Sequence, residues 1–309
     1  MLPDELCRYL MMYLDTKAVI HYRCVNSSFR SASRYHTPHG AYIRGPLRYL
    51  VASFSLRTLH LSLPRKYTEE DISHLSNLES LKIRTHFQNA IQPSYFKYLS
   101  RLTSLDLSCG EGNLDDSSCV HLTRLTHLWL DGNRVTDQGI CQLKNLTSLS
   151  IHNTNGVSDK GLSALTQLTT LDMYNMYHVT NDLCSHLTNL EDLSMTFGNI
   201  THRGVCTLTR LKKLRLTGCH FPSLEGLETL PLTDVSITYS NIHDDQFRHL
   251  PQISTLFLFG NDHFTGEGFK YLTNVQRITC YKIKLKERYR NSTDHLAKLT
   301  SYYEYDCLR

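Results

Sequence analysis

Apolar and polar residues alternate in short segments that recur at regular intervals along the chain. The segment LTHLWLDGN, which begins at Leu125, has the same pattern as LTSLDLSCG from Leu102, LTSLSIHNT from Leu146, LTTLDMYNM from Leu168 and LKKLRLTGC from Leu211. A β-strand points successive side chains to opposite faces. The pattern L-x-x-L-x-L therefore predicts a strand whose leucines are buried and whose intervening residues are exposed.

Eleven copies of this pattern follow one another at intervals of 21 to 24 residues. Their first apolar positions are Leu56, Leu78, Leu102, Leu125, Leu146, Leu168, Leu190, Leu211, Leu232, Ile253 and Val275. After the strand, segments such as VTDQGICQLKNL place Thr136 or Ser158 at an expected helix N-cap, with apolar residues such as Ile140 and Leu143 behind it. Each copy is expected to form a strand backed by a short helix or turn.

The repeat length and pattern resemble those of leucine-rich-repeat proteins. Since one repeat cannot bury its apolar face alone, the resemblance implies an α/β solenoid with parallel strands on a concave face and short helices or turns on a convex face. It covers residues 46–309, including an irregular C-terminal cap. The small polar residue that this family places after the strand is matched by Asn133, Thr154, Cys219, Ser240 and Asn261, but not by Met176 or Gly198.

Alternation along the strands assigns several large and acidic side chains to the exposed concave face. Aromatic side chains on a rigid surface bury much area with little loss of conformational entropy, so they are favoured interface anchors. We expect a target protein to bind through Trp129, Asp131, Asp106, Asp172, Tyr174, Phe257 and Phe259. For the two phenylalanines, an alternative is that the aromatic C-terminal tail, KIKLKERYRNSTDHLAKLTSYYEYDCLR, covers them.

The distribution of charge and hydropathy narrows the class of partner. Of 33 basic and 29 acidic residues, seven and three lie in residues 1–55, which leaves the repeat region balanced at 26 of each sign. This balance argues against nucleic-acid binding. The sequence has no apolar run of about 18 residues and does not start like a secretory signal, so we expect no membrane span and a cytoplasmic or nuclear protein that is not secreted.

The residue types that catalyse reactions or bind metal ions are scattered along the sequence. Ten cysteines occur without C-x-x-C pairs, and Cys141, Cys184 and Cys206 lie in the backing segments, which predicts reduced packing residues. No phosphate-binding glycine loop, metal-spaced His/Cys cluster or Ser-His-Asp constellation stands out in the sequence. We therefore expect no enzymatic activity, no cofactor and no metal.

The first forty residues depart from the repeat, and residues 2–33 read LPDELCRYLMMYLDTKAVIHYRCVNSSFRSAS. Leu-Pro, Glu-Leu, Tyr-Leu, an aliphatic pair, Arg-x-Val and an aromatic-Arg pair follow one another in this order. Leu6, Leu10 and Leu14 are four residues apart and form one stripe of a helix. Because about forty residues cannot bury a self-sufficient core, this apolar surface is expected to pack on a partner or on the first repeats.

Residues 1–45 resemble an F-box, a unit of three helices. The resemblance implies docking on a Skp-type adaptor of a cullin-RING ubiquitin ligase through Leu2, Pro3, Leu6, Leu10, Leu14, Val19, Val25 and Phe29. The implied function is that of a non-catalytic substrate receptor, with the repeats holding the target. Two alternatives remain: a repeat scaffold without a ubiquitin link, whose first residues merely cap the solenoid, and a ligase with a catalytic cysteine. The second lacks room for a catalytic domain beyond Val275, where Cys307 stands near the end.

Overall fold

The computed structural model describes residues 58–61, 67–83, 91–107, 114–281 and 283. Over these residues, short strands alternate with short helical segments, one pair in each repeat. The chain forms two compact units, Met1–Leu146 and Thr147–Arg309.

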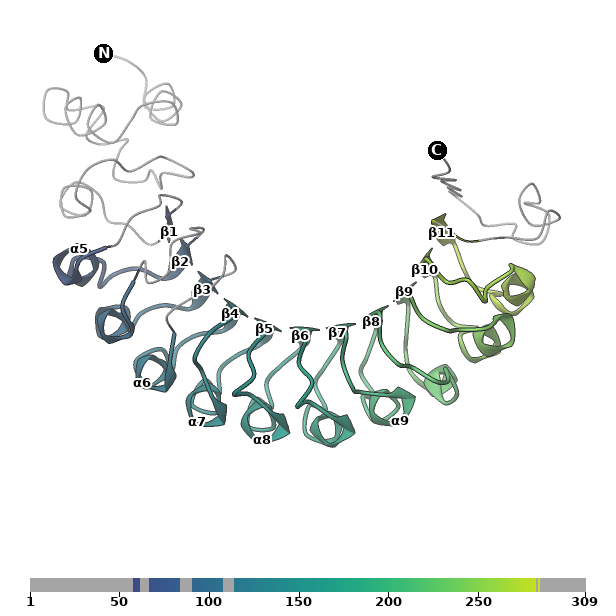
Figure 1. The fold of residues 1–309 in the computed structure, drawn as a ribbon, viewed down its shortest axis with the longest axis horizontal. Helices are drawn as coiled ribbons and strands as arrows, with labels where there is room; N and C mark the ends of the chain where they lie inside the picture. The colour runs from purple at the N-terminus through teal and green to yellow at the C-terminus, as the bar shows by residue number, and fades with distance from the viewer. Residues whose placement is uncertain (1–57, 62–66, 84–90, 108–113, 282, 284–309) are drawn as a thin grey trace, which may run out of the picture. The chain divides into compact units, whose positions relative to one another are not determined.

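The described part of unit 1 contains four parallel strands in sequence order, with a helical segment after each. The strands are β1 (Thr58–Leu61), β2 (Ser80–Ile83), β3 (Ser104–Leu107) and β4 (His127–Asp131). The helical segments are α5 (Glu69–Ser73), η1 (Pro93–Tyr98), α6 (Asp116–Cys119) and α7 (Asp137–Ile140). Within this unit the strands lie on one side and the helical segments on the other (Figure 1).

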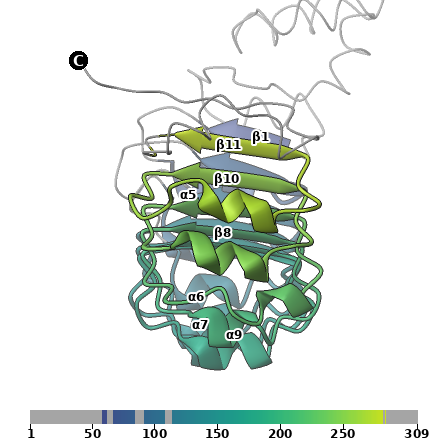
Figure 2. The same cartoon turned by 90° about the vertical axis from the view of Figure 1, so that its right-hand side faces the viewer.

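Unit 2 repeats the same arrangement over seven described strands, each paired in parallel with the next. They are β5 (Ser148–His152), β6 (Thr170–Tyr174), β7 (Asp192–Thr196), β8 (Lys213–Thr217), β9 (Asp234–Thr238), β10 (Thr255–Phe259) and β11 (Arg277–Tyr281). Between them lie α8 (Asp159–Leu162), η2 (Asn181–Ser185), α9 (His202–Val205), η3 (Leu227–Thr229), η4 (Asp244–His249) and η5 (Glu267–Tyr271). Figure 2 shows β8, β10 and β11 running in the same direction.

The core of each unit lies between its strands and its helical segments. The first apolar residue of every repeat from Leu78 to Val275 is at most 2% exposed, as the sequence pattern predicts; Leu56 lies outside the described residues. Along the strands of unit 2, the second and fourth residues are buried and the others are not. The hydrophobic period of two therefore sets which side chains face the core.

A left-handed residue follows each described strand from β4 to β10. Its φ angle lies between 49° and 62° in all seven repeats, at Gly132, Asn153, Asn175, Phe197, Gly218, Tyr239 and Gly260. The next residue is buried at all five positions that match the family, as in Thr154 and Asn261, whose side chains donate to backbone carbonyls at 2.8–3.2 Å. Met176 and Gly198, which depart from the family, follow the same left-handed turn, so the polar residue is not required for it.

Hydrogen bonds between successive repeats anchor the helix N-termini. Thr136 and Ser158 are the N-caps of α7 and α8, as predicted. The Thr136 backbone N–H and hydroxyl donate to the Asp116 carboxylate of the preceding repeat at 2.7 and 2.6 Å. In unit 2, Thr180 donates to Asp159 in the same way at 2.9 and 2.6 Å. A carboxylate at the start of one helix thus satisfies the N-cap of the next.

Some predictions fall outside the described residues or need correction. Residues 1–45, with all eight residues predicted to bind an adaptor, are not described, and the F-box prediction stays a prediction. Cys184 is buried as predicted, whereas Cys141 and Cys206 are only half-buried. These two residues follow the buried helix position by one residue, because the helical period places Ile140 and Val205 in the core instead.

Candidate functional site

The most extended exposed feature of unit 2 is the outer surface of its strands. We define the strand face as the first, third and fifth residues of β5–β11, which point away from the helical segments. Parallel pairing in register aligns these residues into rows, so that Thr196, Thr217 and Thr238 lie side by side on β7, β8 and β9. The strand face is therefore an ordered array of side chains on a hydrogen-bonded sheet.

Aromatic rings gather at the end of the strand face where the strands finish. Tyr174 lies 5.8 Å from the His152 ring and 5.9 Å from the Phe197 ring, between ring centroids. Phe257 and Phe259, both predicted to bind a target, contact the ring of Tyr281 at 5.9 and 6.4 Å. The structure thus places three predicted residues of unit 2 in two ring clusters, one on β6 and one on β10.

Phe197 and Tyr239 also lie among these rings at the strand ends, but the alternation of the strands did not assign them to the exposed face. Both occupy the left-handed position after a strand, and their side chains are 44% and 57% exposed. Other repeats place glycine or asparagine here, because only these residues adopt such a backbone at little cost. A large aromatic residue at a position otherwise filled by Gly or Asn was the signal in the sequence.

Ser150, His152 and Asp172 form a polar cluster beside Tyr174. The His152 Nε2 lies 3.1 Å from Ser150 Oγ and 3.2 Å from Asp172 Oδ2, and the Ser150 hydroxyl donates to the same carboxylate oxygen at 3.0 Å. In a catalytic triad the acid and the nucleophile use different ring nitrogens. Here both neighbours share one nitrogen, so the ring cannot be held by the acid while accepting the serine proton.

The sequence analysis did not identify this constellation because its members come from neighbouring strands. Parallel pairing sets Ser150 opposite Asp172 and His152 opposite Tyr174. Burial raises the pKa of the Asp172 carboxyl, but hydrogen bonds from His152, Ser194 and Ser150 outweigh it and lower the pKa overall. The Asp172 side chain is 39% exposed. It is therefore an ionised group that a partner can reach.

Unit 1 carries the remaining predicted residues on its own strands. Trp129 on β4 is 40% exposed, which confirms the prediction that it faces solvent. The Lys82 ammonium lies 5.8 Å from the centre of its indole ring and forms an ion pair with Asp106. Asp106 and Trp129 are register partners on β3 and β4, and Asp131 ends β4 two residues beyond Trp129. These three predicted residues are therefore close neighbours on unit 1.

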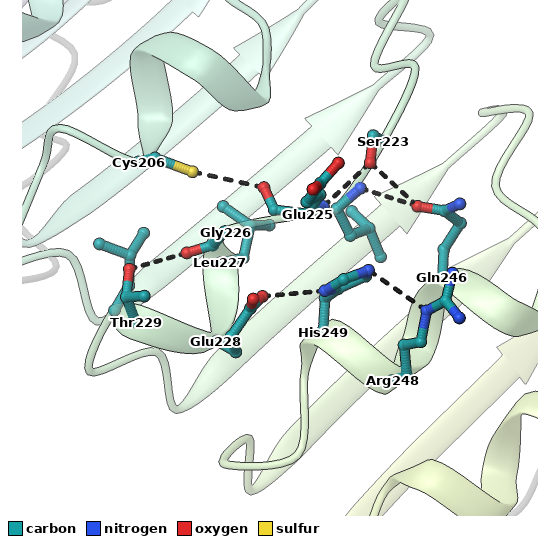
Figure 3. Close-up of polar contacts among 12 residues, drawn as sticks. Cys206, Ser223, Glu225, Gly226, Leu227, Glu228, Thr229, Gln246, Arg248 and His249 are labelled. Carbon is teal, nitrogen blue, oxygen red and sulfur yellow. Dashed lines mark hydrogen bonds and ion pairs between the residues drawn. The ribbon is translucent and has the colours of Figure 1, made fainter.

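A second polar cluster lies on the helical side of unit 2 (Figure 3). Gln246 Oε1 accepts hydrogen bonds from the Ser223 hydroxyl at 3.2 Å and the Leu224 backbone N–H at 3.1 Å. His249 Nδ1 lies 2.9 Å from Glu228 Oε2. The contacts of Gln246 and His249 join the η3 repeat to the η4 repeat, and the Cys206 thiol of the preceding repeat donates to the Glu225 carbonyl. The cluster holds together two repeats whose backing segments are short 3-10 turns.

The described ranges also bear on two other kinds of site, a metal site and a membrane span. These residues contain no group of three or more His, Cys, Asp or Glu side chains suited to hold a metal ion. None of the helices in that part of the chain is both long and apolar enough to cross a membrane. The two strand surfaces, one on each unit, are the candidate functional sites.

The stacked repeats define a leucine-rich-repeat fold, and comparison with known proteins agrees. No protein-family model and no curated protein matches the sequence. The chain is similar to the crystal structure of the internalin InlF from Listeria monocytogenes, with a TM-score of 0.65 and 21% identity over 91% of this chain and 83% of that one. It is also similar to the functional domain of InlJ from the same organism, with a TM-score of 0.53 and 18% identity over 83% of this chain and 64% of that one. At these identities, the similarity shows the fold alone.

Proposed function

We propose that the chain is a non-catalytic scaffold that binds a partner protein on the strand face of unit 2. The observation that carries this proposal is the pair of aromatic clusters at the strand ends, Tyr174 with Phe197 and Phe259 with Tyr239 and Tyr281. Side chains held on a paired sheet lose little conformational freedom on binding, so the energy of burying them goes largely into affinity.

The size of the aromatic groups suits a protein–protein interface. Each Tyr or Phe side chain buries about 150–250 Å² when covered, and aromatic anchors at interface centres contribute about 2 kcal/mol or more. Two such anchors therefore change the dissociation constant by more than about a hundredfold. Trp129, Asp131 and Asp106 on unit 1 remain predicted target-binding residues.

Affinity capture with matched arginine variants tests the proposal. Thr217→Arg introduces a long charged side chain at the centre of the strand face, between Thr196 and Thr238. Thr209→Arg makes the same change at an exposed position in the segment between α9 and β8. We expect partner proteins captured by the wild type to be lost with Thr217→Arg and retained with Thr209→Arg. Equal capture by both variants, with unchanged circular dichroism, would contradict the proposal.

A second candidate function is that of a substrate receptor in an SCF-type ubiquitin ligase. The F-box-like order of Leu-Pro, Tyr-Leu and Arg-x-Val in residues 1–45 supports it. On this proposal, the N-terminal segment binds a Skp-type adaptor and the repeats hold a target, whose effective concentration near the conjugating enzyme rises. The chain itself then supplies no nucleophile or base.

Co-purification with a Skp-type adaptor distinguishes the two functions. The full chain and a variant with Leu2, Pro3 and Leu6 changed to alanine are each expressed with the adaptor. A receptor is expected to retain the adaptor only in the unsubstituted form. If neither form binds it, or both bind equally, the ligase role fails and the scaffold role on the strand face is unaffected.

A further inference from the structure

The acidic groups on the strand face of unit 2 differ in how their charge is balanced. Asp192 on β7 accepts a hydrogen bond from the Arg215 guanidinium at 2.6 Å, which neutralises it. The Asp172 carboxylate contacts only Ser150, Ser194 and His152 among the described residues. Of these three, only His152 can carry a positive charge, and it forms an ion pair with Asp172 when it is protonated. Over the described ranges, no lysine or arginine contacts the Asp172 carboxylate.

Aromatic rings lie further along the same face of the sheet, toward the strand ends. Tyr174 is two residues further along β6, so its ring points to the same face of the sheet as Asp172. The Phe197 ring packs against Tyr174 in an edge-to-face arrangement, with an interplanar angle of 72°. The faces of aromatic rings carry partial negative charge and attract cations. Carboxylate and rings together form a surface that is complementary to one positive charge.

Phe197 combines a left-handed backbone with a ring that is only partly covered. Its φ of 53° is a left-handed conformation, which costs a residue with a side chain about 1–2 kcal/mol. The ring is 44% exposed, and its covered part packs against the Tyr174 ring. The ring lies over Gly218, where an added Cβ would approach Phe197 Cε1 to 2.4 Å. The next repeat thus leaves room for an exposed ring held in a strained conformation.

We propose that Asp172, Tyr174 and Phe197 form a receptor for one arginine or lysine side chain of the partner protein. This inference rests on the proposed function, since it names the chemistry of the group that the strand face binds. A guanidinium is the best match, because it stacks flat on an aromatic ring while its edge donates paired hydrogen bonds to a carboxylate. Neutral or acidic segments gain neither interaction.

The receptor is tested directly with N-acetyl-arginine amide as the probe and N-acetyl-citrulline amide as its uncharged isostere. Binding to the full chain is followed by NMR of isotope-labelled tyrosine and phenylalanine rings at constant ionic strength. We expect the Tyr174 and Phe197 signals to shift with a dissociation constant in the millimolar range, corresponding to about 4 kcal/mol. The citrulline derivative is expected to leave them unchanged.

Matched variants assign the effect to these residues. Asp172→Asn is expected to weaken arginine binding about fivefold or more, whereas Asp245→Asn, an exposed acid in η4 on the helical side, is expected to have no effect. Phe197→Asn keeps a residue that tolerates the left-handed backbone and is expected to weaken binding as well. Equal binding of the citrulline derivative, no ring shifts up to about 50 mM, or indifference to Asp172→Asn overturns the inference.

Failure of the receptor is distinguishable from failure of the proposed function. If captured partners are lost with Thr217→Arg but are bound equally by Asp172→Asn, the strand face binds a protein without a cationic anchor at Asp172. If Thr217→Arg also leaves capture unchanged, the strand face is not the binding surface. Both results overturn the cation receptor, but only the second overturns the scaffold function on this face.

Discussion

Gly204 should not tolerate alanine, although it lies in the helix α9, where alanine is ordinarily preferred. An added Cβ would lie 2.5 Å from Asn181 Oδ1 and 3.1 Å from the Asn181 Cα of the preceding repeat. Asn181 Oδ1 accepts a hydrogen bond from the Thr201 backbone N–H, the N-cap of α9, at 2.8 Å. The new methyl group therefore displaces the acceptor that joins two repeats.

The two opposing contributions have different magnitudes. Replacing glycine by alanine in a helix stabilises it by about 1 kcal/mol. An N–H left without its acceptor costs about 1–3 kcal/mol, and forcing a methyl group into a filled space costs about 1–3 kcal/mol more. We expect Gly204→Ala to lower the free energy of unfolding by about 1–5 kcal/mol. In a unit of this size, each kcal/mol lowers the melting temperature by about 2–4 °C.

Gly198 supplies a matched control in the same unit. A Cβ added there meets only ordinary contacts, the nearest at 3.5 Å from Met195 Sδ, and its backbone is not left-handed. Thermal and urea unfolding, followed by circular dichroism, should show Gly198→Ala within about 1 kcal/mol of the wild type and Gly204→Ala clearly below it. A double variant with Asn181→Ala should lose less than the sum of the single losses. If Gly204→Ala is as stable as the wild type, the inter-repeat contact does not limit this position.

Three further predictions concern thiol reactivity, pH and backbone strain. Burial and the nearby Asp159 raise the pKa of the Cys184 thiol to about 12. At pH 8, iodoacetamide should therefore label Cys184 only after unfolding, whereas it should label the half-buried Cys141 in the folded chain. Hydrogen bonds lower the pKa of Asp172 in the folded chain. The stabilising contribution of Asp172 is therefore complete above its unfolded pKa of about 3.9 and is lost as the pH falls through the folded value. The Asp172→Asn variant should show a shallower loss of melting temperature below about pH 4. Phe197→Asn should unfold at higher urea than Phe197→Ala, since only asparagine readily adopts a φ of 53°; the reverse order would mean that the turn relaxes.

Much of the repeat architecture was predictable because it depends on local order along the chain. The period of two in each strand places Leu128 and Leu130 in the core and exposes Trp129 between them. The residues Thr136 and Ser158 indicate helix starts because their side chains satisfy backbone groups only a few positions away. Such signals are contained within one repeat and need no knowledge of its neighbours.

The contacts between repeats were not predictable in the same way. The Asp116 carboxylate joins Thr136 across 20 positions, and Ser150 meets Asp172 across 22. Each pair depends on the register of two adjacent repeats. The separation itself varies, because the same contact joins Asp116 to Thr136 across 20 positions and Asp159 to Thr180 across 21. The pattern of single repeats does not contain this register.

The sequence by itself determined that the chain is a series of strand-and-turn repeats, which side chains of each strand face the core, and where several helices begin, since all three follow from periods of a few residues. Only the tertiary structure decided that Phe197 and Tyr239 extend from left-handed turns, that Asp172 meets His152 and no described lysine or arginine, and that Gly204 must lack a side chain. The physical reason is that these properties belong to pairs of stacked repeats, whose contacts form when neighbouring strands pair and bring distant residues to hydrogen-bonding distance.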